Sequence, residues 1–164
     1  VNTTPSDLDP LGLSGAEDKM ALALDLVNVR LILEPGIAEM AALNATEEAI
    51  LELRCCCERV EERIASGDMY IQDDIAFHTS VARCSGNKVV EQLIPIIDTA
   101  VMMFVNVTHQ RLTKETVMTH RAIVDAISDR DPIGAKTAMM MHMTYNRNMI
   151  LKLIREEKEK NHRE

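Results

Sequence analysis

The chain has 164 residues, which is enough for one domain with a substantial core and too few for two. Apolar residues make up 46% of it but aromatic residues only 2%, a composition that favours helices and argues against a sheet-rich fold. The formal net charge of −8 argues against a surface that binds the phosphates of DNA, because phosphate binding needs a basic face.

Residues 1–17 are rich in Pro, Gly and small polar residues, which is typical of a linker or the edge of a fragment. We expect one helical domain over residues 18–157 and a solvated, charged tail over residues 158–164. Within the domain the periodicity of apolar residues and the helix-ending residues predict an all-α fold. Six helices are expected, at about 18–43, 47–66, 69–84, 88–109, 114–129 and 132–157.

Several residues mark the ends and irregularities of these helices. The first helix should bend near Pro35, which lacks a backbone donor. Thr46, Asp68 and Asn87 are expected to cap the second, third and fourth helices. Asp131 precedes a proline and therefore predicts the start of the last helix.

Two further features bear on assembly and location. The stretch 101–105 (VMMFV) is apolar nearly all round, so we expect it to be buried or shared with a second subunit in a homodimer. The sequence shows no secretory h-region and no run of 18 apolar residues. We therefore expect a cytoplasmic location and no membrane partner.

The four cysteines include the consecutive residues Cys55, Cys56 and Cys57. Such a triplet can be interpreted as a soft-metal site. Neighbours on a helix point about 100° apart, however, so these thiols do not converge on one ion. We interpret the triplet as ordinary packing in a reducing compartment.

Asp74 and His78 are four residues apart, which places both side chains on one face of the third helix. That face also carries Ile71, Ile75 and Val81, so both polar groups should point into the core.

His120 and His142 lie on the apolar faces of the fifth and sixth helices by the same test. A single histidine on an apolar face is usually a core residue bonded to a backbone carbonyl. Three histidines and a carboxylate together favour a metal site, because burying an unpaired carboxylate is costly and a divalent cation removes that cost. Imidazole with carboxylate suits zinc, which we expect, with nickel and manganese as alternatives.

The chain resembles the C-terminal effector domain, the FCD domain, of the FadR subgroup of GntR-type bacterial transcription regulators. The resemblance covers about residues 22–143, and SDLDPLGL near the start is similar to the family's linker. Four blocks in the same order carry it: VRLILEPGIAEMAAL at 29–43, DDIAFHTSVARCSGN at 73–87, THRAIVDAISDRD at 119–131 and MMMHM at 139–143.

The resemblance implies an antiparallel bundle of six or seven helices with a central cavity, in which Asp74, His78, His120 and His142 hold the metal. A small organic acid would bind at that metal and control DNA binding across a homodimer. DNA would be contacted only by a winged helix-turn-helix domain. We do not find such a domain in this sequence, so we expect the chain to be a fragment of a longer regulator.

Arg30 and Asn87 match family positions near the cavity and are candidates for effector contact. The competing role of Arg30 is a surface ion pair with Glu34, and that of Asn87 is the cap of the fourth helix. The fourth helix carries little positive charge, so the effector could be less acidic than is usual in the family.

Two other functions stay open at this point. One is a helical metalloenzyme that uses the three-His, one-Asp site to activate water, although no further inward acid or base is evident. The other is a structural dimerisation module whose histidines only pack. We expect a ligand sensor and no enzyme.

Overall fold

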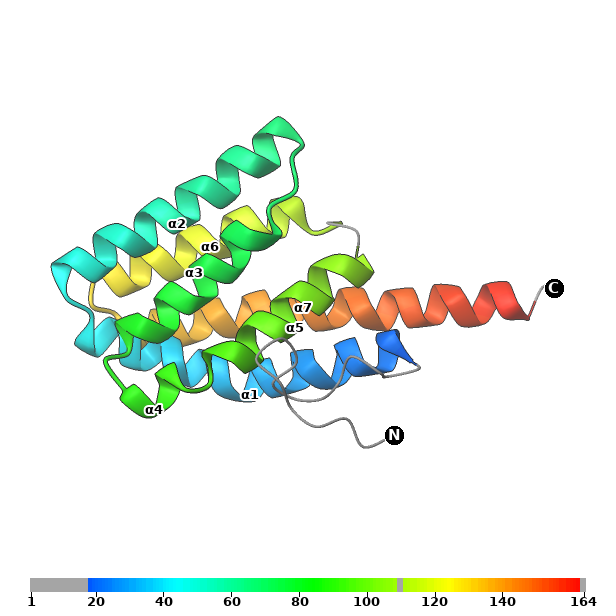
Figure 1. Ribbon diagram of the computed structural model, residues 1–164, viewed down its shortest axis with the longest axis horizontal. Coiled ribbons are helices and arrows are strands. Elements are labelled where there is room, and N and C mark those ends of the chain that lie inside the picture. The colour runs from blue at the N-terminus through cyan, green and yellow to red at the C-terminus, as the bar shows by residue number, and fades with distance from the viewer. Residues whose placement is uncertain (1–17, 109–110, 163–164) are drawn as a thin grey trace.

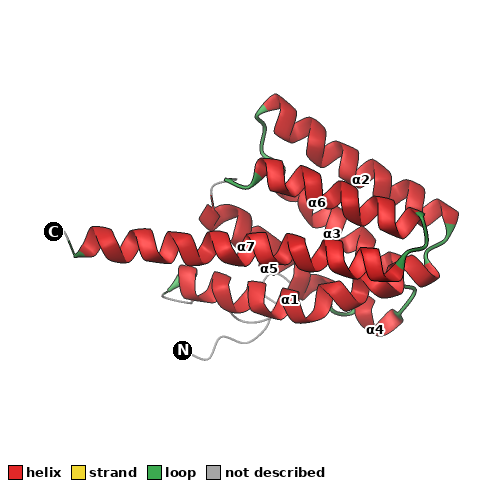
Figure 2. Ribbon diagram, turned by 180° about the vertical axis from the view of Figure 1, so that it is seen from behind, coloured by secondary structure: helices red, strands yellow, loops and turns green. Residues whose placement is uncertain are grey.

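The computed structural model describes residues 18–108 and 111–162, and every regular element in these ranges is a helix (Figure 2). The predicted all-α class is therefore confirmed. The expected linker at residues 1–17 lies outside the described residues. The described residues form seven helices in order: α1 (Lys19–Asn44), α2 (Glu47–Ser66), α3 (Ile71–Cys84), α4 (Lys88–Glu91), α5 (Ile94–Thr108), α6 (Thr113–Ser128) and α7 (Pro132–Asn161).

Local chemistry explains where several of these helices begin and end. The Thr46 hydroxyl accepts from the amide of Ala49, 3.2 Å away, and so caps α2. Gly67 ends that helix in the left-handed conformation at φ 74°, which a glycine adopts without steric cost. Asp131 caps α7 as predicted, with Pro132 at the first helical position.

Two expectations about helix ends are wrong. Asp68 does not cap α3, which begins at Ile71 after the buried Tyr70 and has no side-chain cap. The predicted fourth helix is two helices, α4 and α5. Pro95 has no N–H to donate to the carbonyl of Glu91, and its ring would clash with that carbonyl in a continuous helix. By contrast α1 continues through Pro35 as a single helix, and a bend there stays a prediction.

The bundle places α1 and α2 on opposite sides, with α3, α6 and α7 between them (Figure 1). α7 packs along α1 and α6 and extends beyond the bundle at its C-terminal end. It ends at Asn161 instead of near residue 157, and its last residues are exposed. No described helix is long and apolar enough to cross a membrane.

The packing of the helices leaves room for polar side chains in the middle of the bundle. α3 packs closely on α1, α2 and α5 rather than on α6 or α7. Side chains from α3, α6 and α7 therefore bridge a wider separation in the middle of the bundle. The central cavity expected from the family resemblance stays a prediction.

Candidate metal centre

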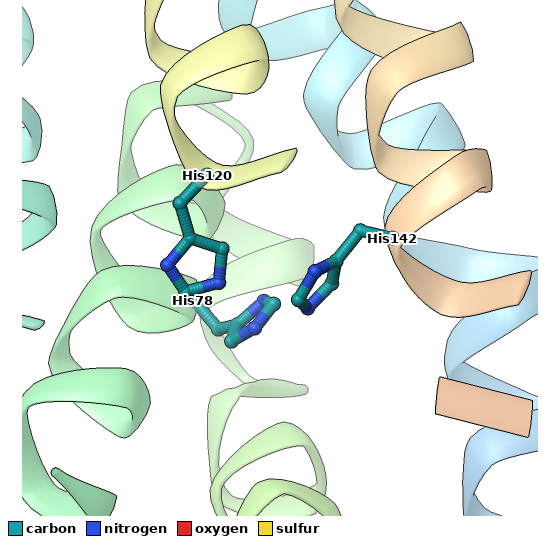
Figure 3. Close-up of side chains that lie close together, drawn as sticks. All are labelled: His78, His120 and His142. Carbon is teal, nitrogen blue, oxygen red and sulfur yellow. The ribbon is translucent and has the colours of Figure 1, made fainter. Parts of the chain in front are cut away.

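Three buried histidines from three helices meet in the middle of the bundle. His78 comes from α3, His120 from α6 and His142 from α7, and each is at most 2% exposed. Each offers one ring nitrogen, and these nitrogens lie within 4.8 Å of one another (Figure 3). Metal–imidazole bonds of about 2 Å keep the nitrogens that bind one ion within about 4 Å of one another, so a bound ion requires a closer set.

His142 is oriented by two neighbours on α6 and α7. Its Nδ1 lies 2.7 Å from the Thr119 hydroxyl, which itself donates to the carbonyl of Glu115. The hydroxyl must therefore accept from His142, so the ring proton is on Nδ1. The lone pair is then on Nε2, where the Asn146 amide lies 3.3 Å away.

His78 has the same tautomer for a different reason. Its Nε2 lies 3.0 Å from Nη2 of Arg30, and a guanidinium can only donate, so Nε2 accepts. The proton is then on Nδ1, which lies 2.7 Å from the Glu34 carboxylate. The two atoms are close, although their angle is not that of a hydrogen bond. A carboxylate behind the ligand ring is a common arrangement at histidine-bound metals.

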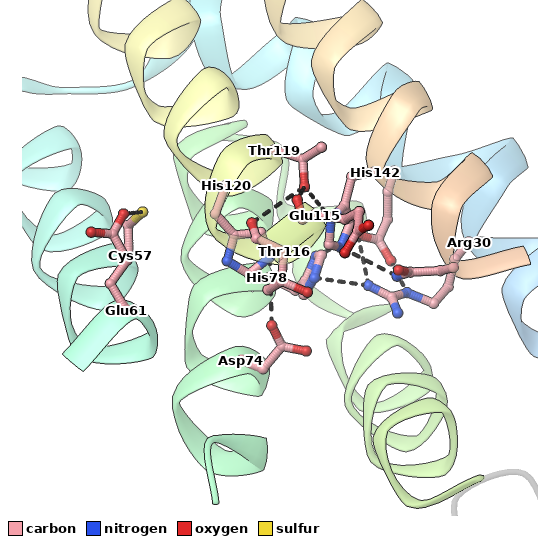
Figure 4. Close-up of polar contacts among 12 residues, drawn as sticks. Arg30, Cys57, Glu61, Asp74, His78, Glu115, Thr116, Thr119, His120 and His142 are labelled. Atoms are coloured by element: carbon pink, nitrogen blue, oxygen red, sulfur yellow. Dashed lines mark hydrogen bonds and ion pairs between the residues drawn. The ribbon is translucent and has the colours of Figure 1, made fainter. Parts of the chain in front are cut away.

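His120 is the residue that packing alone does not explain. Among the described residues, neither of its ring nitrogens has a hydrogen-bond partner. Its Nε2 lies 3.5 Å from Oδ1 of Asp74, which also lacks a hydrogen-bond partner within the described part of the chain (Figure 4). The ring stacks on Phe77 with the centroids 3.8 Å apart, so it is held in place without polar help.

Buried polar atoms without partners are rare, and each costs about 1–3 kcal/mol. The unpaired atoms here are imidazole nitrogens and a carboxylate oxygen beside two oriented imidazoles. This donor set fits a divalent cation of intermediate softness, such as zinc.

Asp74 is placed beside the cluster and not inside its tightest group, which consists of the three histidines alone. It is 4% exposed, and burial raises the pKa of its carboxyl group. A role for Asp74 as the fourth ligand stays a prediction.

The electrostatics of the histidines suit ligands. Burial lowers the pKa of His120 well below its usual value, and the positive charge of Arg30 acts in the same direction. Burial likewise lowers the pKa of His142. Both rings are therefore neutral near pH 7, which is the form that binds metals.

Arg30 is also buried at the cluster, at 2% exposure. It pairs with Glu34, as the alternative interpretation required, but the pair lies in the core and not on the surface. Burial alone would raise the pKa of Glu34, yet Arg30 and His78 outweigh burial and hold it well below its usual range. Sequence reasoning did not place Glu34 at the site.

Asn87 is not brought to the cluster. It is exposed at the start of α4, where its Oδ1 accepts from the amides of Val89 and Val90. The structure thus supports its alternative role as a helix cap.

The cysteine triplet contributes nothing to a metal site in the described part of the chain. Cys55 is exposed, whereas Cys56 and Cys57 are buried, and all three are free thiols. None belongs to the group of possible metal ligands found there.

Comparisons with known proteins agree with this architecture. The HTH-type transcriptional regulator YcbG of Bacillus subtilis is 28% identical over 88% of this chain and 63% of its own length. The HTH-type transcriptional repressor NanR of Citrobacter rodentium is 29% identical over 70% of this chain and 46% of its own. The solved structure of Streptococcus agalactiae GntR is 32% identical with a TM-score of 0.76, over 88% of this chain and 66% of that one.

This chain spans between about half and two thirds of the length of these relatives. YcbG and NanR are named as transcription regulators, which confirms the expectation of a regulator domain in place of an enzyme. Residues 25–145 match the family described as the FCD domain, so the chain belongs to the FCD family of GntR-type regulators.

Proposed function

We propose that this chain is the ligand-sensing and dimerisation domain of a GntR-type regulator and holds a divalent metal through Asp74, His78, His120 and His142. The observation that carries the proposal is the pair of unpaired nitrogens on His120, buried beside two oriented histidines and an unpaired Asp74 oxygen. A purely structural core would leave these atoms unsatisfied at a cost to stability.

The proposed metal is zinc, with nickel or manganese as alternatives for the same donors. When bound, the metal would supply a Lewis-acidic anchor for a carboxylate oxygen. The protein's own residues do the remaining work. Glu34 and Thr119 lie beside Nδ1 of His78 and His142, which favours the proton on Nδ1 and the lone pair on Nε2 of each ring.

The effector that these residues favour is a small organic acid. Arg30 is buried at the cluster, and its Nη1 has no hydrogen-bond partner in the described residues. A buried guanidinium with a free donor is suited to a carboxylate. We leave Asn87 out of the proposed effector site because it is exposed and caps α4.

Regulation would follow from a difference in affinity. An effector changes DNA binding only as far as it binds one conformation of the domain better than another. In this proposal a winged helix-turn-helix domain beyond this sequence reads the DNA in the cytoplasm.

A homodimer is part of the proposal, but the apolar stretch on α5 is weak support for it. Val101, Phe104 and Val105 are buried within this chain. Large apolar side chains stay exposed on the two helices that pack along each other: Ile32 on α1 is 78% exposed and Ile133 on α7 is 74% exposed. Light scattering of the purified chain tests this state.

The test of the sensor is metal analysis of the purified domain, followed by thermal unfolding with and without chelator. We expect about one divalent ion per chain and a lower Tm after chelation. Calorimetry of small organic acids on the metal-loaded domain then identifies the effector class. A chain that contains no metal and is indifferent to both chelator and added Zn²⁺ contradicts the proposal.

A further inference from the structure

Arg30 is engaged in two directions at once inside the cluster. Its Nε and Nη2 donate to the carboxylate of Glu34, and Nη2 also lies 3.0 Å from Nε2 of His78. Nη1 has no hydrogen-bond partner within the described ranges and is inaccessible to solvent. Figure 4 shows the guanidinium between its own helix and the His78 ring.

The contact between Arg30 and His78 uses the lone pair that a metal would need. A neutral imidazole has one nitrogen that donates and one that accepts. In His78 the Nδ1 side faces Glu34, so the accepting lone pair is on Nε2, and Arg30 occupies it. Nε2 has no second in-plane lone pair. Arg30 and a metal ion cannot both bind it.

We propose that Arg30 couples the metal site to the anion site: its Nη2 leaves the lone pair of His78 when a divalent cation binds there, and the released guanidinium then receives the anion. This inference rests on the proposed metal and effector sites. It adds an order of events, in which metal binding creates the anion site.

Glu34 holds the guanidinium of Arg30 in place while Nη2 moves from His78 to the anion. It bonds Nε of Arg30 from one turn further along α1, so the guanidinium stays anchored in the core when Nη2 is released. Nη1, already without a partner, and Nη2 would then both be available to one carboxylate. Arg30 therefore competes with the metal for His78 and, once released, binds the anion.

The first test is a titration with Co²⁺, whose visible absorption reports imidazole coordination, on the whole chain. In R30Q the cation no longer displaces a guanidinium, so we expect Co²⁺ to bind about tenfold more tightly, as for the loss of one charged hydrogen bond. Sodium acetate is the anion probe. It should raise Co²⁺ affinity in the unaltered protein and do so several-fold less in R30Q.

R147Q is the matched control, since it removes the same charge from α7. Arg147 donates to Asn28 on α1, and no hydrogen bond of its side chain reaches the histidines. We expect it to bind Co²⁺ and respond to acetate like the unaltered protein. Circular dichroism checks that R30Q is folded.

A second measurement needs no variant. In ¹⁵N-labelled protein, a coupling across the hydrogen bond should connect Arg30 Nη2 with His78 Nε2 before zinc is added and vanish at saturation. Absence of the coupling before zinc, or its persistence afterwards, overturns the inference.

The outcomes separate this inference from the proposed function. If the unaltered protein shows no Co²⁺ bands, the metal site and the coupling both fail. If the bands form and disappear in H142A, but R30Q matches the unaltered protein in Co²⁺ affinity and acetate response, the metal site stands and only the coupling is wrong.

Discussion

Two regions of this molecule carry residues that can bind soft or intermediate metals, and they behave in opposite ways. The cysteines at 55–57 are adjacent in sequence, yet one is exposed and two are buried on α2 as free thiols. His78, His120 and His142 are 42 and 22 residues apart, yet their ligand nitrogens lie within 4.8 Å. Closeness in sequence on a helix therefore says little about shared ligation, whereas a shared inward face says much.

The difference extends to how the polar atoms are satisfied. Cys57 lies 3.6 Å from Glu61 and Cys56 contacts Arg59, so these thiols have partners on their own helix. His120 has none for either nitrogen among the described residues. Buried polar atoms that have partners within the protein need no ligand, whereas buried polar atoms without partners indicate where a ligand binds.

The largest effect expected is on metal binding by the histidine cluster. H120A or H142A should abolish it, because each removes a nitrogen ligand that no nearby residue replaces. For the unaltered chain, Zn²⁺ at 1,000 times its Kd should add about 4 kcal/mol of stability. That corresponds to a rise in Tm of roughly 8–16 °C for a domain of this size. Neither variant should show this rise in thermal unfolding.

The control for that prediction lies in the other region. C55S/C56A/C57A should keep the full zinc-dependent rise in Tm, with at most a modest loss of basal stability from the two buried positions. If the cysteine variant loses the rise and H120A keeps it, the two regions have been assigned the wrong way round.

Much of the site was predictable from helical periodicity alone. Spacing by about 100° per residue places Asp74, His78, His120 and His142 inward, and the structure buries all four. The same test applied to α1 would have found Glu34. Arg30 and Glu34 fall on the buried stripe that also includes Val27, Ile37 and Ala41. The i, i+4 charge pair suggested a surface interaction and hid this signal.

Other features could not be obtained from periodicity. The tautomers of His78 and His142 depend on contacts between different helices, such as that of Thr119 with His142. Nothing in a single sequence marks Thr119 as that partner. Pro95, in contrast, was a readable signal for the break between α4 and α5, because a proline cannot donate to the preceding turn.

Substitution of Asp74 should have the next largest effect on Zn²⁺ binding, and it tests whether Asp74 belongs to the ligand set. D74N should weaken Zn²⁺ binding about 10–100-fold, the range seen when a group that supports metal ligation is lost. Without metal, D74N should not lower stability at pH 7, because burial raises the pKa of Asp74 and its ionised form disfavours folding there. Calorimetry with Zn²⁺ and thermal unfolding in chelator measure the two effects.

Asp73 is the matched control for Asp74. It pairs with Arg59 and Arg63 at 3.3 Å near the surface. D73N should lose at most about 1 kcal/mol of stability and leave Zn²⁺ affinity unchanged. Equal Zn²⁺ affinity of D74N and D73N would remove Asp74 from the ligand set and leave the three histidines.

Thr119 should have a smaller effect, because it orients the proposed ligand His142 without being a ligand itself. T119V keeps the shape of the side chain but cannot accept from Nδ1 of His142. We expect Zn²⁺ affinity to fall about tenfold, at the lower end for such supporting groups. T119S retains the hydroxyl and should restore most of it. If T119V and T119S bind Zn²⁺ equally, the tautomer of His142 is not set by this contact.

The smallest effect is expected in the cysteine region, where zinc should change nothing. At pH 8 one thiol per native chain should react rapidly with a thiol reagent, because Cys55 is exposed. Burial raises the pKa of Cys57 to about 12 and that of Cys84 to about 11, and it also raises the pKa of Cys56. Those three therefore carry little reactive thiolate and should be labelled only after unfolding. Protection of the fast thiol by added Zn²⁺ would show that the triplet binds metal after all, and the contrast between the two regions would collapse.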